Sequence, residues 1–211
     1  FLPVSVLDQK KKSLIYEGDD AGYYIPWRTV YKEASLSTPC RMVFDASART
    51  PGGTSLNDIL CKGENRLANI HNILLKFRSK PAAFTCDIRM AYNMVSLDPA
   101  NLPYHRFLWK EGLEESSPVV DYVVTTLIYG VRPVGNCLIA GFKKLADYVL
   151  EHHPEQAAAG VEALLNSIYV DDVAHADETA ERNKATAESL DFVLSMGSME
   201  VKGYTFSGQP P

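Results

Sequence analysis

The sequence lacks the features that identify a membrane protein or a disulfide-stabilised one. No apolar run reaches the ~18 residues that a membrane-spanning helix needs, and no signal-peptide pattern opens the chain. The four cysteines are widely spaced without a Cys-x-x-Cys pair, which argues against zinc and redox motifs. Internal repeats and low-complexity tracts are missing as well. We therefore expect a globular protein with reduced, cytosolic thiols and no membrane as a partner.

The sequence also lacks a strong excess of charge of either sign. Of its 211 residues, 46% are hydrophobic and 22% are charged, which predicts one large domain or two small ones with a true core. The net charge of −5 does not by itself point to a nucleic-acid-binding protein. Basic residues nevertheless gather in the first half of the chain, and the local field matters more than the total for attracting a polyanion.

Apolar periodicity predicts helices near 67–80, 138–152 and 177–197. His152-His153-Pro154 is expected to end the second of these helices, and Asp177 to cap the third. Ser55 is expected to cap a short helical turn. These start and stop signals divide the chain into short elements of alternating type.

Runs that are β-prone predict strands, while residues 1–36 predict only short strands or an extended arm. The expected strands lie near 41–48, 82–88, 104–109, 119–129 and 201–206. Apart from an inserted group of strands, the order of elements resembles a split β-α-β, ferredoxin-like module. We therefore assign the α+β class, with an antiparallel sheet that carries helices on one face.

Two adjacent carboxylates, Asp171 and Asp172, interrupt an apolar, β-prone run, which predicts a β-hairpin with the acidic pair at its tip. Adjacent aspartates repel one another, so a fold that presents them together is expected to hold a cation; a solvated turn explains the pair alone equally well. A third carboxylate, Asp87, near the end of strand 82–88, favours the cation site. In a four-stranded antiparallel sheet, this strand and the hairpin can lie side by side.

A cluster of carboxylates implies phosphoryl-transfer chemistry. Hard oxygen ligands suit Mg²⁺, with Mn²⁺ as an alternative, and Mg²⁺ usually shares its shell with substrate phosphates. Two such ions about 3.5–4 Å apart can clamp the attacking and leaving oxygens of an in-line transfer. The acids alone fit nucleotide cyclisation equally well, so they do not name the substrate.

Several motifs resemble those of one polymerase family. Tyr169-Val170-Asp171-Asp172 resembles the Y-x-D-D motif of reverse transcriptases, and the segment from Asp87 to Tyr92 resembles their upstream D-x-x-x-x-[FY] motif. Residues 41–47, 55–58, 74–78 and 106–109 resemble one subgroup, the polymerases of Bel/Pao-type LTR retrotransposons. The likeness runs in the family's order from about residue 24 to 206. It implies an RNA-directed DNA polymerase core, which transfers dNMP from a dNTP to a primer 3′-OH on an RNA or DNA template.

The resemblance also implies which residues act. Asp87, Asp171 and Asp172 match the catalytic ligands of Mg²⁺. Tyr92 matches the aromatic ring that closes the sugar pocket against a 2′-hydroxyl, and Arg41 matches a phosphate-binding arginine. An ordinary core tyrosine and a surface arginine are the alternatives for these two.

Other residues match the substrate-binding segments of the family. Tyr169 and Val170 match the positions at the primer terminus. Lys202 matches a lysine proposed to protonate pyrophosphate, although an exposed strand lysine is the simpler interpretation. Arg132-Pro133 departs from the usual Ser-Pro pair, which puts contacts to the template in doubt. The further nucleotide-binding residues that the resemblance implies are Ile88, Arg89, Met90, Ala91, Tyr129 and Gly130.

The resemblance implies a right-hand polymerase with fingers at 1–62 and 95–128 and palm at 63–94 and 129–211. The chain begins at Phe1 rather than at Met, so we expect a piece of a longer pol polyprotein, whose thumb and RNase H domains are absent from this chain. A pol origin implies cytoplasmic, virus-like particles, with the nucleus as an alternative location. A non-catalytic retrotransposon remnant that binds nucleic acid or protein, and a nucleotide cyclase, are the competing hypotheses.

Overall fold

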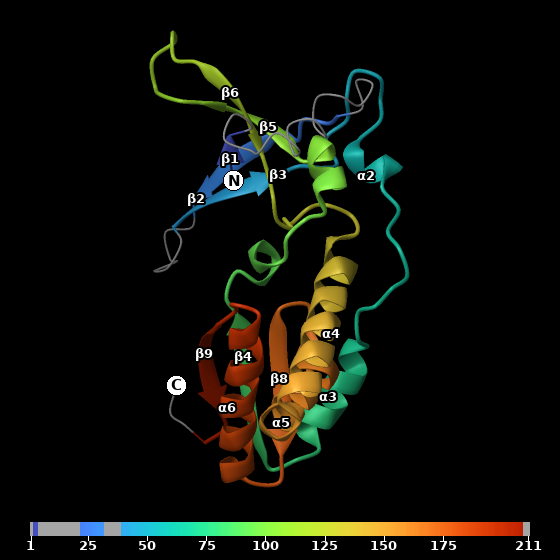
Figure 1. Cartoon of the computed structure of the whole chain (residues 1–211), viewed down its shortest axis with the longest axis vertical. Coiled ribbons are helices and arrows are strands. Elements are labelled where there is room, and N and C mark those ends of the chain that lie inside the picture. Colours follow the sequence, from blue (N-terminus) through green and yellow to red (C-terminus); the bar gives the residue numbers. More distant parts are fainter. Residues whose placement is uncertain (1, 4–21, 32–38, 209–211) are drawn as a thin grey trace. The chain divides into compact units, whose positions relative to one another are not determined.

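A computed structural model describes residues 2–3, 22–31 and 39–208 (Figure 1). The chain divides into two compact units: the first comprises Phe1–Lys62 and Val95–Val134, the second Gly63–Met94 and Gly135–Pro211. The boundaries therefore fall after residues 62, 94 and 134, beside the expected ones after 62, 94 and 128. The assignment of these units to fingers and palm stays a prediction, as does the arm expected at 1–36, much of which lies outside the described residues.

The first unit is built from small antiparallel sheets. Strand β2 pairs with β3 in one sheet, and a second sheet has the order β1-β6-β5. Phe44 of β3 and Phe107 of β5 meet edge to face, with ring centroids 5.2 Å apart, and both side chains are buried. The elements are β1 (Leu2–Pro3), β2 (Trp27–Tyr31), β3 (Cys40–Phe44), α2 (Leu56–Ile59), η3 (Pro99–Tyr104), β5 (Arg106–Lys110) and β6 (Val119–Val123).

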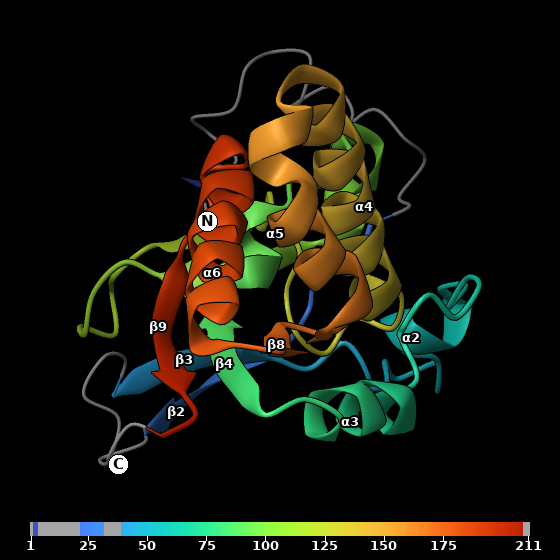
Figure 2. The same ribbon diagram turned by 90° about the horizontal axis from the view of Figure 1, so that it is seen from below.

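The second unit is a four-stranded antiparallel sheet in the order β7-β8-β4-β9. Helices α5 and α6 cover one face of this sheet (Figure 2), and α3 contacts β7 and β8. The elements are α3 (Ile70–Arg78), β4 (Ala82–Ile88), η2 (Ala91–Met94), α4 (Val134–His152), α5 (Pro154–Asn166), β7 (Ile168–Tyr169), β8 (Asp172–Asp177), α6 (Ala180–Met196) and β9 (Val201–Phe206). The predicted α+β class is confirmed.

Strand β4 alternates between buried and more exposed side chains, as a strand with one covered face does. Phe84, Cys86 and Ile88 are buried, whereas Thr85 is exposed and Asp87 is half-buried. The alternation therefore directs Asp87 to the face of β4 opposite to its apolar side chains. The sequence predicted the strand and its one carboxylate, and the alternation of its two faces is a finding of the structure.

Two local predictions about helices need correction, and one is confirmed. Pro154 does not only end α4: it is the first residue of α5, a helix that the periodicity did not predict. The cap of α6 is Thr179, whose side chain accepts a hydrogen bond from the Arg182 N–H at 3.2 Å, because Asp177 is still part of β8. Ser55 caps α2 as predicted, in a reciprocal capping box with Asp58.

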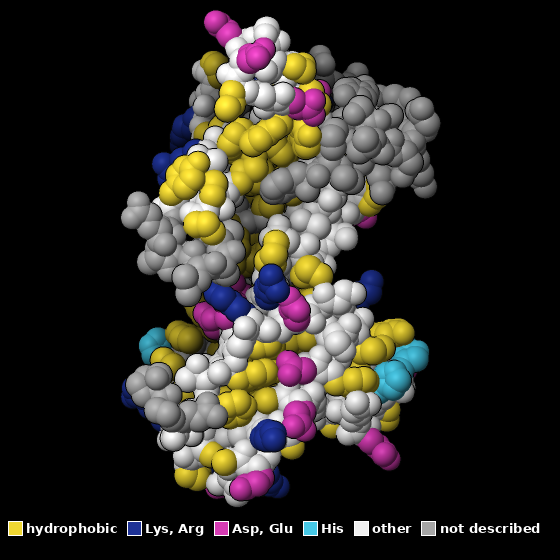
Figure 3. Space-filling model, turned by 90° about the vertical axis from the view of Figure 1, so that its left-hand side faces the viewer, with side chains coloured by type: hydrophobic (Ala, Val, Ile, Leu, Met, Phe, Trp, Pro, Cys, Tyr) yellow, Lys and Arg dark blue, Asp and Glu magenta, His cyan; other side chains and the backbone are white. Residues whose placement is uncertain are grey.

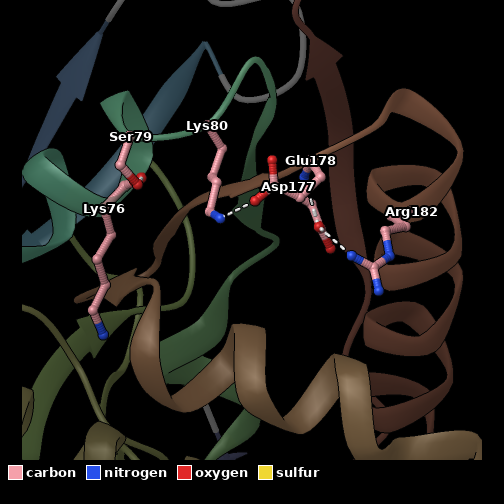
Figure 4. A network of polar contacts seen from close by, with 6 residues as sticks. All are labelled: Lys76, Ser79, Lys80, Asp177, Glu178 and Arg182. Carbon is pink, nitrogen blue, oxygen red and sulfur yellow. Dashed lines mark hydrogen bonds and ion pairs between the residues drawn. The ribbon is translucent and has the colours of Figure 1, made fainter.

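The connection between β8 and α6 carries ion pairs at its surface (Figure 4). Lys80, which precedes β4, pairs with Glu178, and Arg182 on α6 lies 3.5 Å from Asp177. All four side chains are substantially exposed or at the surface, so each pair contributes little to stability. Among the described residues, no helix is both long and apolar enough to cross a membrane.

The close crossing of α5 and α6 depends on a glycine. A Cβ atom on Gly160 would lie 2.4 Å from backbone atoms of Ser189, which is too close for any side chain. The Ser189 hydroxyl accepts a hydrogen bond from the Gly160 N–H at 2.9 Å and donates one to the Gln156 carbonyl at 2.6 Å. Gln156 and Gly160 are four residues apart, so this hydroxyl lies against the hydrogen-bond ladder of α5 itself.

We expect Gly160→Ala to lower the free energy of unfolding of the second unit by about 1–3 kcal/mol or more, because overpacking forces the two helix backbones apart. Urea unfolding followed by far-UV circular dichroism measures the change. Gly203→Ala on β9 is the matched control, since a Cβ there meets no atom within 4 Å and should change stability by less than about 0.5 kcal/mol. Equal effects of the two substitutions would contradict the close-crossing argument.

His105 makes the stability of the first unit depend on pH. Its ring is buried and its Nδ1 lies 3.0 Å from the Asn101 carbonyl oxygen, and burial lowers its pKa below the ordinary value of 6.5. Below about pH 6.5 the unfolded chain binds a proton at His105 more readily than the folded unit does. The free energy of unfolding should therefore be highest above about pH 6.5 and should decrease as the pH falls below it. We expect His105→Asn, which keeps a donor near Nδ1, to flatten this slope.

Both tryptophans, Trp27 and Trp109, lie in the first unit, so their fluorescence during urea unfolding at several pH values reports on that unit. His71→Asn, at an exposed position on α3, serves as the control and should leave the slope unchanged. An unaltered slope in His105→Asn would show that another group causes the pH dependence.

Candidate functional site

The predicted acidic hairpin is present. Tyr169 at the end of β7 pairs with Asp172 at the start of β8, so Val170 and Asp171 form a two-residue turn. Val170 has a φ of 64°, a conformation that a β-branched residue rarely adopts but that tight hairpin turns favour. The surrounding sheet must hold this strained residue in place.

The sheet brings the third carboxylate to the hairpin. Asp87 of β4 is directly opposite Asp172 of β8, and residues opposite one another in an antiparallel pair have Cβ atoms about 4.5–5.5 Å apart. The Ile88 N–H donates to the Asp171 carbonyl oxygen at 3.0 Å and so ties the turn to β4. The expected side-by-side placement of strand 82–88 and the hairpin is therefore confirmed, while the roles of the carboxylates stay predictions.

The electrostatics of this cluster favour a cation. Burial raises the pKa of Asp172, and the charges of Asp171 and Asp87 raise it further. Lys202 of β9 lies 3.8 Å from Asp87, measured from Nζ to Oδ2, and both side chains are about half exposed. Such a contact compensates only part of the negative charge, because an exposed ion pair in water is weak.

The donor set suits a hard cation. Carboxylate oxygens are the ligands that Mg²⁺ and Mn²⁺ prefer. Within the described part of the chain, no three His, Cys, Asp or Glu side chains are arranged to enclose an ion. Mg²⁺ does not need such an enclosure, since one or two carboxylates with waters and substrate phosphates complete its shell. Asp87, Asp171 and Asp172 therefore fit an open, substrate-completed site better than a closed structural one.

The residues that follow Asp87 form a tight turn into η2. Met90 has a φ of 50°, and the Arg89 side chain pairs with Glu200 at 2.6 Å, while the Arg89 N–H donates to the Glu200 carbonyl. The segment from Ile88 to Ala91 therefore follows Asp87 directly in the sequence and lies in the same unit as the carboxylates. Both the side chain and the backbone N–H of Arg89 are engaged with Glu200, and the nucleotide-binding role of this segment stays a prediction.

Tyr92 is buried, with only 4% of its surface exposed. Burial raises the pKa of its hydroxyl to about 12, and the charge of Asp171 contributes to the shift. The burial is what an ordinary core tyrosine would show, whereas the influence of Asp171 is what a residue beside the hairpin would show. The sugar-gate role of Tyr92 stays a prediction.

Arg41, Tyr129 and Gly130 belong to the first unit, whereas the carboxylates belong to the second. Arg41 is exposed on β3 opposite Val30, and Tyr129 is 56% exposed. Gly130 has a φ of +93°, and a Cβ atom there would lie 2.9 Å from the Phe44 carbonyl oxygen. Both observations require glycine at this position, so the path of the loop depends on it.

Sequence reasoning included Asn57 in the motif at 55–58 but did not predict its role, which is to organise this loop. Its Nδ2 donates to the Gly130 carbonyl at 2.8 Å, and its Oδ1 accepts from the Arg132 N–H at 2.8 Å. The Arg132 guanidinium in turn donates to the Asn57 carbonyl at 3.1 Å. Asn57 and Gly130 are 73 positions apart in the sequence, so no local pattern reveals the contact. Arg132, which departs from the family pattern, thus has a structural partner in this chain.

We expect Asn57→Ala to release the loop, because one substitution removes hydrogen bonds to two backbone groups. The amide of Arg132 should exchange with solvent at least about fivefold faster in hydrogen-exchange measurements, with the rest of the first unit still protected. Asn72→Ala, at an exposed position on α3, is the control. Unchanged exchange at Arg132 would show that the loop does not depend on Asn57.

On the face shown in Figure 3, acidic and basic side chains intermingle over the second unit, in the lower part of the view. The positive field expected of a nucleic-acid-binding surface therefore does not extend over this whole face.

Comparison with known proteins supports the fold. No protein-family model matches the sequence, and no curated protein does. The foamy viral protease-reverse transcriptase in complex with an RNA/DNA hybrid superposes with a TM-score of 0.57 at 19% identity, over 87% of this chain and 21% of that one. The native protease-reverse transcriptase of prototype foamy virus gives a TM-score of 0.59 at 18% identity, over 84% of this chain and 20% of that one.

At this level of identity the likeness is one of fold, and the chain has a reverse-transcriptase-like fold. It spans about a fifth of the length of these two solved chains.

Proposed function

We propose that the chain is the fingers and palm portion of an RNA-directed DNA polymerase from a Bel/Pao-type LTR retrotransposon. One observation carries the proposal: Asp87 and Asp172 face each other across β4 and β8, with Asp171 in the adjoining turn. The reverse-transcriptase-like fold around these carboxylates supports it. In this proposal the second unit is the palm and the first unit is the fingers.

The carboxylates of Asp87, Asp171 and Asp172 would hold Mg²⁺ or Mn²⁺, which would activate a primer 3′-OH and neutralise the triphosphate. The strained turn at Val170 fixes the direction of the two adjacent aspartates beside the primer terminus. In the segment from Ile88 to Ala91, the Ile88 and Arg89 N–H groups bind the Asp171 and Glu200 carbonyls, so the backbone donors to the triphosphate would come from Met90 and Ala91. Tyr92 blocks a 2′-hydroxyl, so that the enzyme selects deoxynucleotides.

The first unit would contribute contacts to the incoming nucleotide and to the template. The Arg41 guanidinium is exposed and can bind phosphate bidentately. Tyr129 presents an exposed ring on a loop whose path Gly130 and Asn57 fix.

The partners in this proposal are a primed RNA or DNA template, a dNTP and the remainder of a pol polyprotein. The foamy viral neighbour was solved with an RNA/DNA hybrid, which supports a hybrid as a ligand here. That neighbour is about five times longer than the matched region, which supports the idea that further domains act with this piece; in this proposal they include a thumb and an RNase H domain. Cytoplasmic virus-like particles would be its location.

We expect the protein to incorporate dNTP, but not NTP, into a primer on an RNA template in the presence of Mg²⁺ or Mn²⁺. Asp171→Asn should reduce incorporation at least about 100-fold, the scale of losing one electrostatic group at a reacting centre. Asp147→Asn on α4, an exposed carboxylate that pairs with Lys143, is the matched control and should retain full activity.

Because duplex affinity comes largely from many phosphate contacts, the assay is run in parallel on a longer piece that includes the downstream thumb. Incorporation by either protein that survives Asp171→Asn would contradict the assignment of the site. If both proteins are folded and both are inactive, the alternative of a non-catalytic remnant that binds nucleic acid or protein is correct.

A further inference from the structure

A serine and a histidine meet across the base of the acidic hairpin. Ser167 lies between α5 and β7, and its Oγ is 3.2 Å from Nδ1 of His175 on β8. Beside this contact, the backbone N–H of Ala174 donates a hydrogen bond to the Ser167 carbonyl oxygen at 2.8 Å. The side-chain contact therefore joins the two arms of the hairpin next to the Ile168–Val173 pair, on the side away from the turn. His175 is three residues after Asp172 in the sequence.

The same histidine also contacts the strand that carries Asp87. His175 is opposite Phe84 of β4, and the two rings pack with their centroids 5.3 Å apart. Ser167 is buried, and the His175 Nε2 is buried with no hydrogen-bond partner among the described residues. The ring thus makes its polar contact through Nδ1, and its apolar contact with β4 fixes its plane.

The hairpin needs such a restraint because its own pairing is short. Strand β7 has two residues, and only Ile168 and Tyr169 pair with β8. The turn that these two pairs support contains Val170 at a φ of 64°, a strained conformation for a β-branched residue. The Ala174–Ser167 and Ile88–Asp171 backbone bonds and the pairing of β8 with β4 add to these two pairs, and the Ser167–His175 contact adds a side-chain link between the two arms of the hairpin.

We propose that Ser167 and His175 are positioning residues for Asp171 and Asp172, which hold the turn in the direction that the carboxylates require. The proposal rests on the proposed function only for its catalytic consequence; the restraint on the turn is independent of it. His175 is neutral with its proton on Nδ1, which donates to Ser167 Oγ. The other tautomer would bury an N–H without an acceptor, which is the costlier choice.

The test uses the whole chain and three substitutions. Ser167→Ala removes only the hydroxyl, His175→Leu removes the polar ring, and His175→Asn keeps a nitrogen donor near the position of Nδ1. Ser195→Ala on α6 is the control, because that hydroxyl bonds only to the Phe192 carbonyl, away from the hairpin.

The first readout is hydrogen exchange, which needs no activity. The Ile88 amide, bonded to the Asp171 carbonyl, reports on the turn, and the Ser207 amide, bonded to the Ala83 carbonyl, reports on the opposite side of the sheet. We expect about fivefold faster exchange at Ile88 in Ser167→Ala and His175→Leu, and unchanged exchange at Ser207. His175→Asn should restore most of the protection, and Ser195→Ala should change nothing.

The second readout separates this inference from the function on which its catalytic part rests. We expect Mn²⁺ to bind the Ser167→Ala protein several-fold more weakly, and dNTP incorporation to lose kcat with little change in KM. If the unaltered chain binds no Mn²⁺ and extends no primer, the proposed function fails, while exchange at Ile88 still decides the positioning role. Unchanged exchange at Ile88, or equal acceleration at Ile88 and Ser207, would overturn the positioning role of Ser167 and His175.

Discussion

The register between β4 and β8 is the constraint on which the site depends. Side chains alternate along a strand, so a slip by one residue would turn Asp87 toward the helices and bring Cys86 out. The burial of Phe84, Cys86 and Ile88 on β4 prevents that slip, together with Val173 on β8. The position of the carboxylates is therefore fixed by apolar residues that take no part in any chemistry, and the helices on the covered face act on the site through this register.

The register places like charges opposite one another, which a sheet ordinarily avoids. The electrostatic cost of this arrangement is reflected in the raised pKa of Asp172. Burial is the largest cause of the shift, and the charges of Asp171 and Asp87 add to it. The strained backbone of Val170 adds to the energetic cost of this site. Local rules are therefore broken at Val170 and at the opposed pair Asp87 and Asp172, and the pairing of β4 with β9 is also irregular between Cys86 and Ile88. Such concentrated violations are typical of functional sites, because only a surrounding core of well-packed residues can hold them.

Much of this arrangement was predictable from the sequence, because its signals are local. The apolar runs around Asp171 predicted the hairpin, and the spacing of Leu138 and Phe142 predicted α4. Helix α5 was missed although Ala157, Val161 and Leu164 recur at helical spacing on its buried face, because Pro154 was interpreted as the end of a helix rather than as the first residue of the next one. The contacts of Asn57 with Gly130, and of Ser167 with His175, join separated residues of ordinary type. They leave no pattern that a single sequence can display.

The loop from Gly130 to Arg132 bears on whether the chain is a working polymerase or a remnant. A segment that had decayed would be expected to leave polar groups without partners at the point where it departs from the family. Here the opposite holds: Asn57 satisfies the Gly130 carbonyl and the Arg132 N–H, and Arg132 itself donates back to Asn57. Gly130 keeps the conformation that only glycine adopts easily. Arg132 and its partner Asn57 form one consistent structural unit, as a loop that has not decayed should, and a polymerase and a non-catalytic binding module would share this property.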